Sequence, residues 1–218
     1  MNEELKNTLA AWGLELSGPQ IEKLEIFAGE LKTNNAVMNL ISQKDEPEIW
    51  PRHIADSLAA APLLRRFLKP GALIADSGTG AGFPGMPLAA ALEEFRFELL
   101  DSNGKRCDFL GRAAAAMKIS NVAVFKRRVG EGPKSPRYGA VLERAMGKLE
   151  NILPQCLNMV VEGGVFLAWQ SAAQMAAPRP EVLQAINNAR AVLAEKINYR
   201  LPGEQEDRFI AVFKKRGR

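Results

Sequence analysis

The chain has 218 residues, of which 47% are hydrophobic and 25% are charged, and its formal net charge is +4. This size and hydrophobic content exclude wholesale disorder and suit one α/β domain with an appendage. No apolar run approaches the ~18 residues of a membrane span, and the acidic, amphipathic start does not resemble a signal peptide. We therefore expect a cytoplasmic protein that neither enters nor crosses a membrane.

Histidine and cysteine are too sparse for a metal centre. The single histidine and the absence of a C-x-x-C pair exclude a plausible zinc site, so we expect no metal. Cys107 and Cys156 lie far apart in helix-like stretches. This pattern predicts two buried free thiols in a reducing compartment.

Residues 1–68 predict an N-terminal helical subdomain. Apolar residues recur at helical spacing in three stretches, 5–12, 17–31 and 45–64. Asp45 is the expected cap of the third helix. Within that helix Arg52 and Asp56 would be i,i+4 partners. The asparagine-rich stretch 32–42 predicts a loop or a helix junction.

From residue 69 to 218, strand-like runs alternate with helical ones, which predicts a second, larger domain. Strands are expected at 72–77, 96–102, 121–128, the end of 134–145, and 162–170. Helices are expected at 86–95, 105–119, 149–160 and 181–193. The runs 195–201 and 207–215 predict a closing hairpin. The alternation indicates an α/β, Rossmann-like fold, a mostly parallel seven-stranded sheet with helices on both faces.

A glycine-rich loop follows the first expected strand, where such folds bind ligands. It fits two patterns, Gly80-x-Gly82-x-x-Gly85 of dinucleotide sites and Asp76-x-Gly78-x-Gly80 of S-adenosylmethionine (SAM) sites. The negative charge of a pyrophosphate would be repelled by the carboxylate of Asp76, whereas SAM carries cationic groups that the carboxylate would attract. The acid therefore favours SAM, with an NAD-dependent oxidoreductase as the alternative.

Asp101 ends the second expected strand. A carboxylate at that edge can accept both hydroxyls of a ribose, in NAD enzymes and methyltransferases alike. It could also cap the helix that follows. The oxidoreductase alternative lacks a catalytic group, because His53 precedes the nucleotide fold and no Tyr-x-x-x-Lys pair is present.

Basic residues gather near the ends of the expected elements, which indicates a phosphate-binding face. The clusters are 65–66, 105–106, 126–128 and 214–216. Lys105 and Arg106 follow the ribose acid directly and are the best phosphate candidates. Arg128, at the end of the third expected strand, is a further candidate for RNA binding.

Four stretches resemble, in order and spacing, the RsmG (GidB) family of bacterial 16S rRNA methyltransferases. They are "RHIADS" (52–57), "DSGTGAGFPGMPLA" (76–89), "LLDSNGKR" (99–106) and "ERA" (143–145). The resemblance implies a class I methyltransferase fold with SAM as methyl donor. It also implies guanine N7 in the 530 loop of 16S rRNA as target and the 30S ribosomal subunit as partner. We expect the chain to act as a monomer.

The resemblance also implies site residues by matching motif. Gly78 and Phe83 match SAM contacts, and Asp101 matches the ribose acid; Asp76 and Gly80 belong to the same loop. Val129 and Gly130 match the pair that flanks the adenine. The active-site arginine matches Arg144, and the N-terminal motif facing the cleft matches Arg52, His53, Asp56 and Ser57.

The chain departs from the family pattern in several places, two of which concern the expected site. Gly130 stands where members usually have glutamate, and Gln170 stands where they commonly have a lysine. These departures leave open a SAM-dependent methyltransferase acting on another RNA or a small molecule. A non-catalytic, RNA-binding relative is a further alternative.

Methyl transfer to guanine N7 needs no general base, because N7 carries an available lone pair. Catalysis would then come from positioning and desolvation. Arg144 is expected to position the base or the cofactor electrostatically. His53 is expected either to contact the substrate or to join a structural hydrogen-bond cluster.

Overall fold

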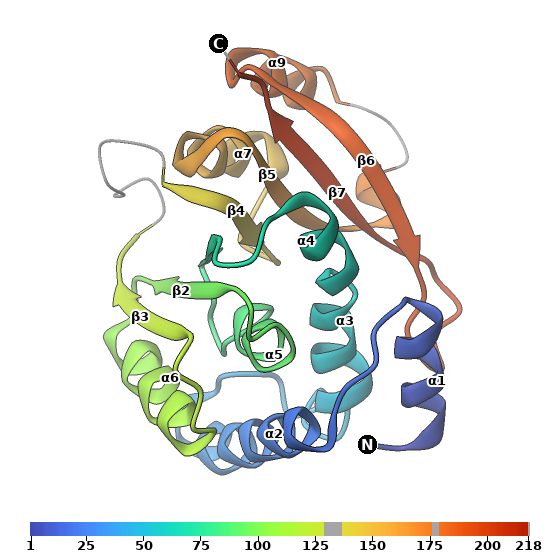
Figure 1. Cartoon of the computed structure of the whole chain (residues 1–218), viewed down its shortest axis with the longest axis vertical. Coiled ribbons are helices and arrows are strands. Elements are labelled where there is room, and N and C mark those ends of the chain that lie inside the picture. Colours follow the sequence, from blue (N-terminus) through green and yellow to red (C-terminus); the bar gives the residue numbers. More distant parts are fainter. Residues whose placement is uncertain (129–136, 176–178, 218) are drawn as a thin grey trace.

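The computed structural model describes residues 1–128, 137–175 and 179–217. Within these ranges seven strands form one sheet in the order β3-β2-β1-β4-β5-β7-β6 (Figure 1). The first five strands pair in parallel, and β7 runs antiparallel to β5 and β6. The expected doubly wound sheet with a terminal hairpin is confirmed. The strands are β1 (Leu73–Ser77), β2 (Arg96–Asp101), β3 (Val122–Lys126), β4 (Tyr138–Glu143), β5 (Val160–Ser171), β6 (Ala191–Tyr199) and β7 (Arg208–Lys215).

Helices cover both faces of the sheet, and each face has its own hydrophobic cluster between the helices and the strands. Ile74 of β1 belongs to one cluster and Ala75 to the other, as alternation along a strand requires. Helices α7 (Leu149–Met159) and α9 (Pro180–Asn188) cover one face, and the four-residue α8 (Ala172–Met175) follows β5. The opposite face carries α1 (Glu3–Ala11), α2 (Gly18–Met38), the π-helical turn η1 (Ile49–Ile54), α3 (Ala55–Leu58), α4 (Ala61–Phe67), α5 (Gly85–Ala91) and α6 (Gly104–Ala116) (Figure 1).

Helix α2 is longer than expected, so the predicted loop at 32–42 is wrong over its first part. The helix starts in a capping box, in which Ser17 and Gln20 satisfy each other's backbone N–H groups. It continues to Met38 because the buried Asn35 side chain accepts a hydrogen bond from the N–H of Ile41, 2.9 Å away. Asn39 then ends the helix in the left-handed conformation.

The predicted single helix at 45–64 is broken into three pieces. Pro51 lacks the N–H that an α-helical turn needs, and the chain there forms the turn η1 instead. A second break falls between α3 and α4. The predicted cap Asp45 is not at a helix start; it accepts a hydrogen bond from Ser42 Oγ.

The helix expected at 181–193 ends at Asn188. Residues from Ala191 onward join the sheet as β6, where Ala191 pairs with Lys215. Sheet pairing therefore outweighs the helical spacing of this stretch.

The N-terminal helices share a hydrophobic cluster with the sheet, in which Leu9 and Phe27 lie with Ile74 and Leu99. The division at residue 68 stays a prediction. None of the helices in the described ranges combines the length and hydropathy of a membrane span. Both cysteines are free, and Cys156 is buried as expected, but Cys107 is only half-buried.

Candidate functional site

The glycine loop joins β1 to α5 at the carboxyl edge of the sheet. Gly78 adopts a φ of +66°, a conformation that L side chains rarely take, and an added Cβ would lie 2.5 Å from Met146 Sδ. Gly85 is required for a different reason, since an added Cβ would lie 2.2 Å from Leu99 Cδ2 and 2.7 Å from Asp76 Oδ2. The loop thus combines a sharp turn with close packing of α5 against the sheet.

Asp76 ties this loop to β1. Its Oδ2 atom accepts hydrogen bonds from Thr79 Oγ1 at 2.6 Å and from the N–H of Gly85 at 2.8 Å. Burial raises the pKa of Asp76 to about 6, although these two hydrogen bonds favour the carboxylate. We therefore interpret Asp76 first as a support of the loop.

Asp101 joins the end of β2 to the same loop. Its Oδ2 accepts a hydrogen bond from the N–H of Gly80 at 2.9 Å, and its Oδ1 accepts one from Asn103 at 2.8 Å. The alternative role as helix cap is not seen, because Asn103 caps α6 through the N–H groups of Lys105 and Arg106. Each carboxylate oxygen keeps a second lone pair that a ribose hydroxyl can use.

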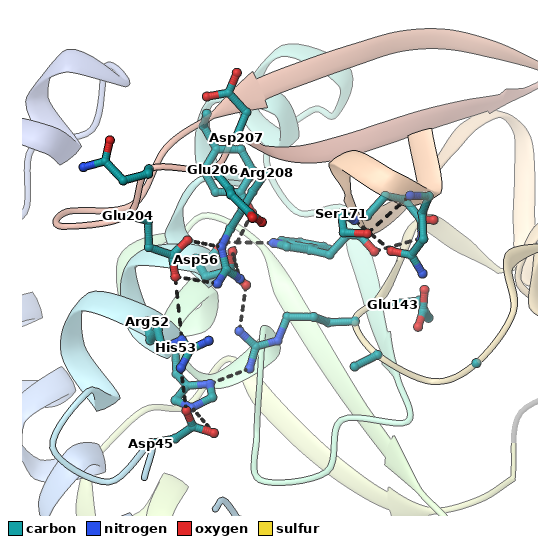
Figure 2. Close-up of a pocket in the computed structure, with 18 residues that line it drawn as sticks. Asp45, Arg52, His53, Asp56, Glu143, Ser171, Glu204, Glu206, Asp207 and Arg208 are labelled. Atoms are coloured by element: carbon teal, nitrogen blue, oxygen red, sulfur yellow. Dashed lines mark hydrogen bonds and ion pairs between the residues drawn. The ribbon is translucent and has the colours of Figure 1, made fainter. Parts of the chain in front are cut away.

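Asp56 forms the centre of a buried network that joins three strands, β5, β6 and β7, and the loop after β4 to α3 (Figure 2). Its carboxylate accepts hydrogen bonds from Arg144 at 2.8 Å, Tyr199 at 2.5 Å and Arg208 at 3.4 Å. The indole N–H of Trp169 donates to the backbone oxygen of Asp56 at 2.9 Å. The network fixes Arg144, on the loop after β4, against the N-terminal helices.

The expected pairing of Arg52 with Asp56 is wrong. Arg52 points toward Asp45, 3.1 Å away, and Glu204, 3.6 Å away, and its side chain is about half exposed (Figure 2). The π-helical turn changes the rotation of the chain between Arg52 and Asp56, so helical i,i+4 geometry does not apply there.

His53 and Phe83 hold the other side of Arg144. The guanidinium lies 5.0 Å from the Phe83 ring centre, and its Nη2 lies 3.1 Å from His53 Nδ1. The His53 ring stacks on Phe83 at 5.0 Å. Burial, assisted by Arg144, lowers the pKa of His53 to about 4, so the ring is neutral at pH 7 and its Nδ1 accepts from Arg144.

A cavity of about 600 Å³ opens beside this network, at the carboxyl ends of β4 and β5. Four residues expected at the site line it, Arg52, His53, Asp56 and Arg144. Acidic side chains outnumber the arginines on its wall, which disfavours a phosphate there. The acids are Asp45, Asp56, Glu143, Glu204, Glu206 and Asp207, and the arginines are Arg52, Arg144 and Arg208.

The other expected residues that the structure describes do not line this cavity, although Phe83 contacts His53 and Arg144, which do. Among the described residues, the loop glycines, Phe83, Asp76 and Asp101 belong to the β1–β2 side of the edge. Lys105 and Arg128 are exposed, and Arg106 lies 3.7 Å from Asp101. Val129 and Gly130 lie outside the described residues.

Sequence reasoning missed Tyr199, Arg208 and Glu143 as site residues. Tyr199 is 143 positions from Asp56 along the chain and Arg208 is 152. No local pattern links such distant residues. Glu143 could have been noticed as an acid that ends an apolar strand beside the expected arginine.

Several buried polar atoms at this edge have no hydrogen-bond partner among the described residues. They are His53 Nε2, Asp76 Oδ1, Glu143 Oε2 and Gln170 Oε1. Buried polar atoms are nearly always hydrogen-bonded, and exceptions call for an explanation such as a bound ligand. Three of these residues lie at the carboxyl ends of β1, β4 and β5 and the fourth lies on η1, so the edge that carries the glycine loop and Arg144 also carries unsatisfied polar groups.

Comparison with known proteins agrees with this geometry. Residues 20–194 match the family model GidB, described as rRNA small subunit methyltransferase G. Two similar proteins carry the name ribosomal RNA small subunit methyltransferase G. The one from Idiomarina loihiensis is 34% identical over 99% of this chain and 100% of its own length. The one from Salmonella arizonae is 32% identical over 98% of both chains.

Solved structures share the fold at low sequence identity. A SAM-dependent O-methyltransferase from Thermotoga maritima aligns with a TM-score of 0.56 at 18% identity, covering 86% of this chain and 72% of that one. At this identity the likeness supports the class I methyltransferase fold alone.

Proposed function

Because the chain belongs to the rRNA small subunit methyltransferase G (GidB) family, we propose that it methylates N7 of a guanine in 16S rRNA. The chain is a SAM-dependent rRNA methyltransferase, and family membership disfavours the oxidoreductase alternative. The observation that carries the proposal is the pairing of two sites on one sheet edge. The glycine loop and Asp101 lie at β1 and β2, and a polar cavity with Arg144 lies at β4 and β5.

The loop side of this edge fits SAM. SAM supplies a methyl group that its positive sulfonium makes electrophilic. We propose that Asp101 accepts the ribose hydroxyls and that the backbone at Gly78, Gly80 and Phe83 contacts the cofactor. The Phe83 ring itself packs on Phe27 and His53. We therefore propose that Phe83 contacts the cofactor through its backbone. Val129 and Gly130 are the proposed neighbours of the adenine.

The cavity side fits a reaction that requires no proton removal. His53 is neutral and bonded to Arg144, so it suits a positioning role better than that of a general acid at pH 7. Arg144 is held from two sides, by Asp56 and by His53, with its charge directed to the cavity wall. We propose that this fixed guanidinium orients the reacting groups, which is where catalysis without a base gains its rate.

The proposed RNA contacts on Lys105, Arg106 and Arg128 lie outside the acidic cavity, and Arg52, on the cavity wall, is a proposed further contact. Lys105 and Arg106 occupy the first turn of α6, next to the ribose acid. If RNA phosphates bind there, a nucleobase can enter the acid-rich cavity while the RNA backbone stays at the rim of the cavity. We propose that the RNA is bound within the 30S ribosomal subunit, in the cytoplasm. The chain is proposed to act there as a monomer.

The double substitution of Lys105 and Arg106 by alanine should weaken RNA binding and flatten its salt dependence. Losing two phosphate contacts should reduce the steepness of log K against log salt by roughly 1.4 to 1.8. Filter binding across a salt series measures this. The matched control removes two exposed lysines elsewhere, Lys32 and Lys118, and should leave the slope unchanged. An unaltered slope in the first variant would exclude these residues from the RNA footprint.

The function itself is tested on 30S subunits and on 16S rRNA from a strain that lacks the modification. Incubation with SAM should yield one 7-methylguanosine, located by mass spectrometry of RNA fragments. SAM binding without any N7-methylated product would contradict the proposal. A product on another RNA or on a small molecule would favour the corresponding alternative, and salt-sensitive RNA binding without turnover would favour a non-catalytic relative.

A further inference from the structure

Two side chains that line the cavity each carry a buried acceptor atom that the network around Asp56 leaves unused. Glu143 is 1% exposed, and while its Oε1 accepts the N–H of Met146, its Oε2 has no partner among the described residues. Gln170 is 6% exposed; its Nε2 donates to the Trp169 carbonyl at 2.8 Å, and its Oε1 likewise lacks a partner. Both side chains line the same cavity.

The sheet places these acceptors on neighbouring strands. Glu143 at the end of β4 pairs with Ala168 of β5. Gln170 lies two residues beyond Ala168, so its side chain points to the same face of the sheet as that of Ala168. The two acceptors therefore belong to one corner of the cavity wall.

The surroundings leave the Glu143 carboxylate short of hydrogen-bond donors. Burial raises its pKa to about 7, and the nearby Asp76 adds to the rise against the one backbone hydrogen bond from Met146. A ligand that brought further N–H donors would supply what the protein does not. Since most of the charged groups on the cavity wall are acidic, that ligand presents donors there and no phosphate.

We propose that Glu143 and Gln170 read the Watson–Crick edge of the target guanine. Glu143 Oε2 would accept N1–H, and Gln170 Oε1 would accept the 2-amino group. This inference rests on the proposed function, because it takes guanine as the target. It adds the residues that select the base.

The chemistry of the base fits the two acceptors. Guanine offers two adjacent donors on its Watson–Crick edge, whereas adenine presents an acceptor, N1, at the position that would meet the carboxylate. The N7 atom lies on the opposite edge of the base, so it stays free while the Watson–Crick edge is held. Reading an extruded base through this edge is a general solution for enzymes that modify nucleobases.

The variant Glu143→Gln tests the proposal with little change in shape. Its amide oxygen can keep the hydrogen bond from Met146, which turns the amide nitrogen, a donor, toward the cavity. We expect kcat/KM for 30S subunits to fall about 30-fold, since a hydrogen bond to a charged group is lost. The Kd for SAM should stay within about twofold, because the change removes no contact proposed for the cofactor.

Glu150→Gln is the matched control. Glu150 is a largely buried glutamate on α7 that pairs with Arg179 and does not line the cavity. It should leave kcat/KM for 30S subunits unchanged. Thermal melting of both variants checks that the fold is intact.

A binding assay separates this inference from the proposed function. With protein saturated by S-adenosylhomocysteine, ligand-observed NMR compares guanosine, adenosine and inosine monophosphates. The wild type should favour guanosine monophosphate over adenosine monophosphate, and Glu143→Gln should abolish that preference. Gln170→Leu should abolish the preference for guanosine over inosine monophosphate, which lacks the 2-amino group.

Each result decides one of the two proposals. If Glu143→Gln and Gln170→Leu both methylate rRNA normally and keep the nucleotide preferences of the wild type, the proposed recognition of guanine by these residues is overturned. The proposed function would then remain intact. A loss of SAM affinity in Glu143→Gln with guanosine binding unchanged would also overturn the proposed recognition of guanine, by assigning Glu143 to the cofactor. A guanosine preference that depends on Glu143, without N7 methylation of rRNA, would uphold the inference and contradict the proposed function.

Discussion

Replacing Asp56 by alanine is expected to lower the free energy of unfolding by about 3–5 kcal/mol, the usual cost of removing one partner from a buried ion pair. The substitution leaves the guanidinium of Arg144 and the hydroxyl of Tyr199 without their carboxylate acceptor. Burial, together with the charge of Asp56, raises the pKa of Tyr199, so its proton is retained for this hydrogen bond. Urea unfolding followed by circular dichroism measures the change.

Asp207→Ala is the matched control for this prediction. Asp207 pairs with Arg200 at 2.8 Å, but both side chains are substantially exposed. An exposed pair of this kind contributes about 0–1 kcal/mol. If both substitutions lowered stability equally, Asp56 would not hold the N-terminal helices and the C-terminal hairpin together.

Asp56→Asn separates stability from activity. Asparagine keeps the shape and one acceptor, so the fold should persist with a smaller loss of stability. The ion pair that orients Arg144 would be lost, and kcat should fall while the Kd for SAM changes little. Unchanged kcat in a folded Asp56→Asn variant would show that Arg144 needs no carboxylate to act.

Replacing Asp101 by alanine should weaken SAM binding about 100-fold, because two hydrogen bonds from ribose hydroxyls to a charged group are lost. RNA affinity should change much less, since the proposed RNA contacts lie on other side chains. Calorimetry with SAM and filter binding with RNA give the two values. The exposed Asp108, on α6, provides the control substitution Asp108→Ala.

Asp101 also supports the glycine loop through the N–H of Gly80. Part of the expected loss of SAM affinity therefore reflects a loosened loop. Asp101→Asn retains an acceptor for Gly80 and should bind SAM with intermediate affinity. Equal losses of SAM and RNA affinity in Asp101→Ala would contradict the ribose assignment and indicate general damage to the carboxyl edge.

The sequence predicted the order of strands and helices from residue 72 onward because each element carries its own period of apolar residues. The errors lie where tertiary contacts override that period. Helix α2 runs through an asparagine-rich stretch because Asn35 finds a partner in Ile41, and residues from Ala191 leave a helical pattern to pair with β7.

The candidate site likewise has one part that the sequence predicted and one part that it did not. The loop, its supporting acid Asp76 and the acid at the end of β2 were predicted, because short motifs hold them next to the strands that place them. Glycine at 78 and 85 is dictated by local turn geometry and close packing, which a motif can record. The family resemblance added Arg144 and His53 as candidates.

Only the tertiary structure decided what surrounds Arg144. Its carboxylate partner comes from α3, and that carboxylate is shared with Tyr199 of β6 and Arg208 of β7, which long stretches of chain separate. The unpartnered acceptors of Glu143 and Gln170 likewise become visible only when β4 and β5 lie side by side. A sequence records local periodicity and short motifs, but hydrogen-bond satisfaction is a property of the packed chain, and that property defines the cavity side of this site.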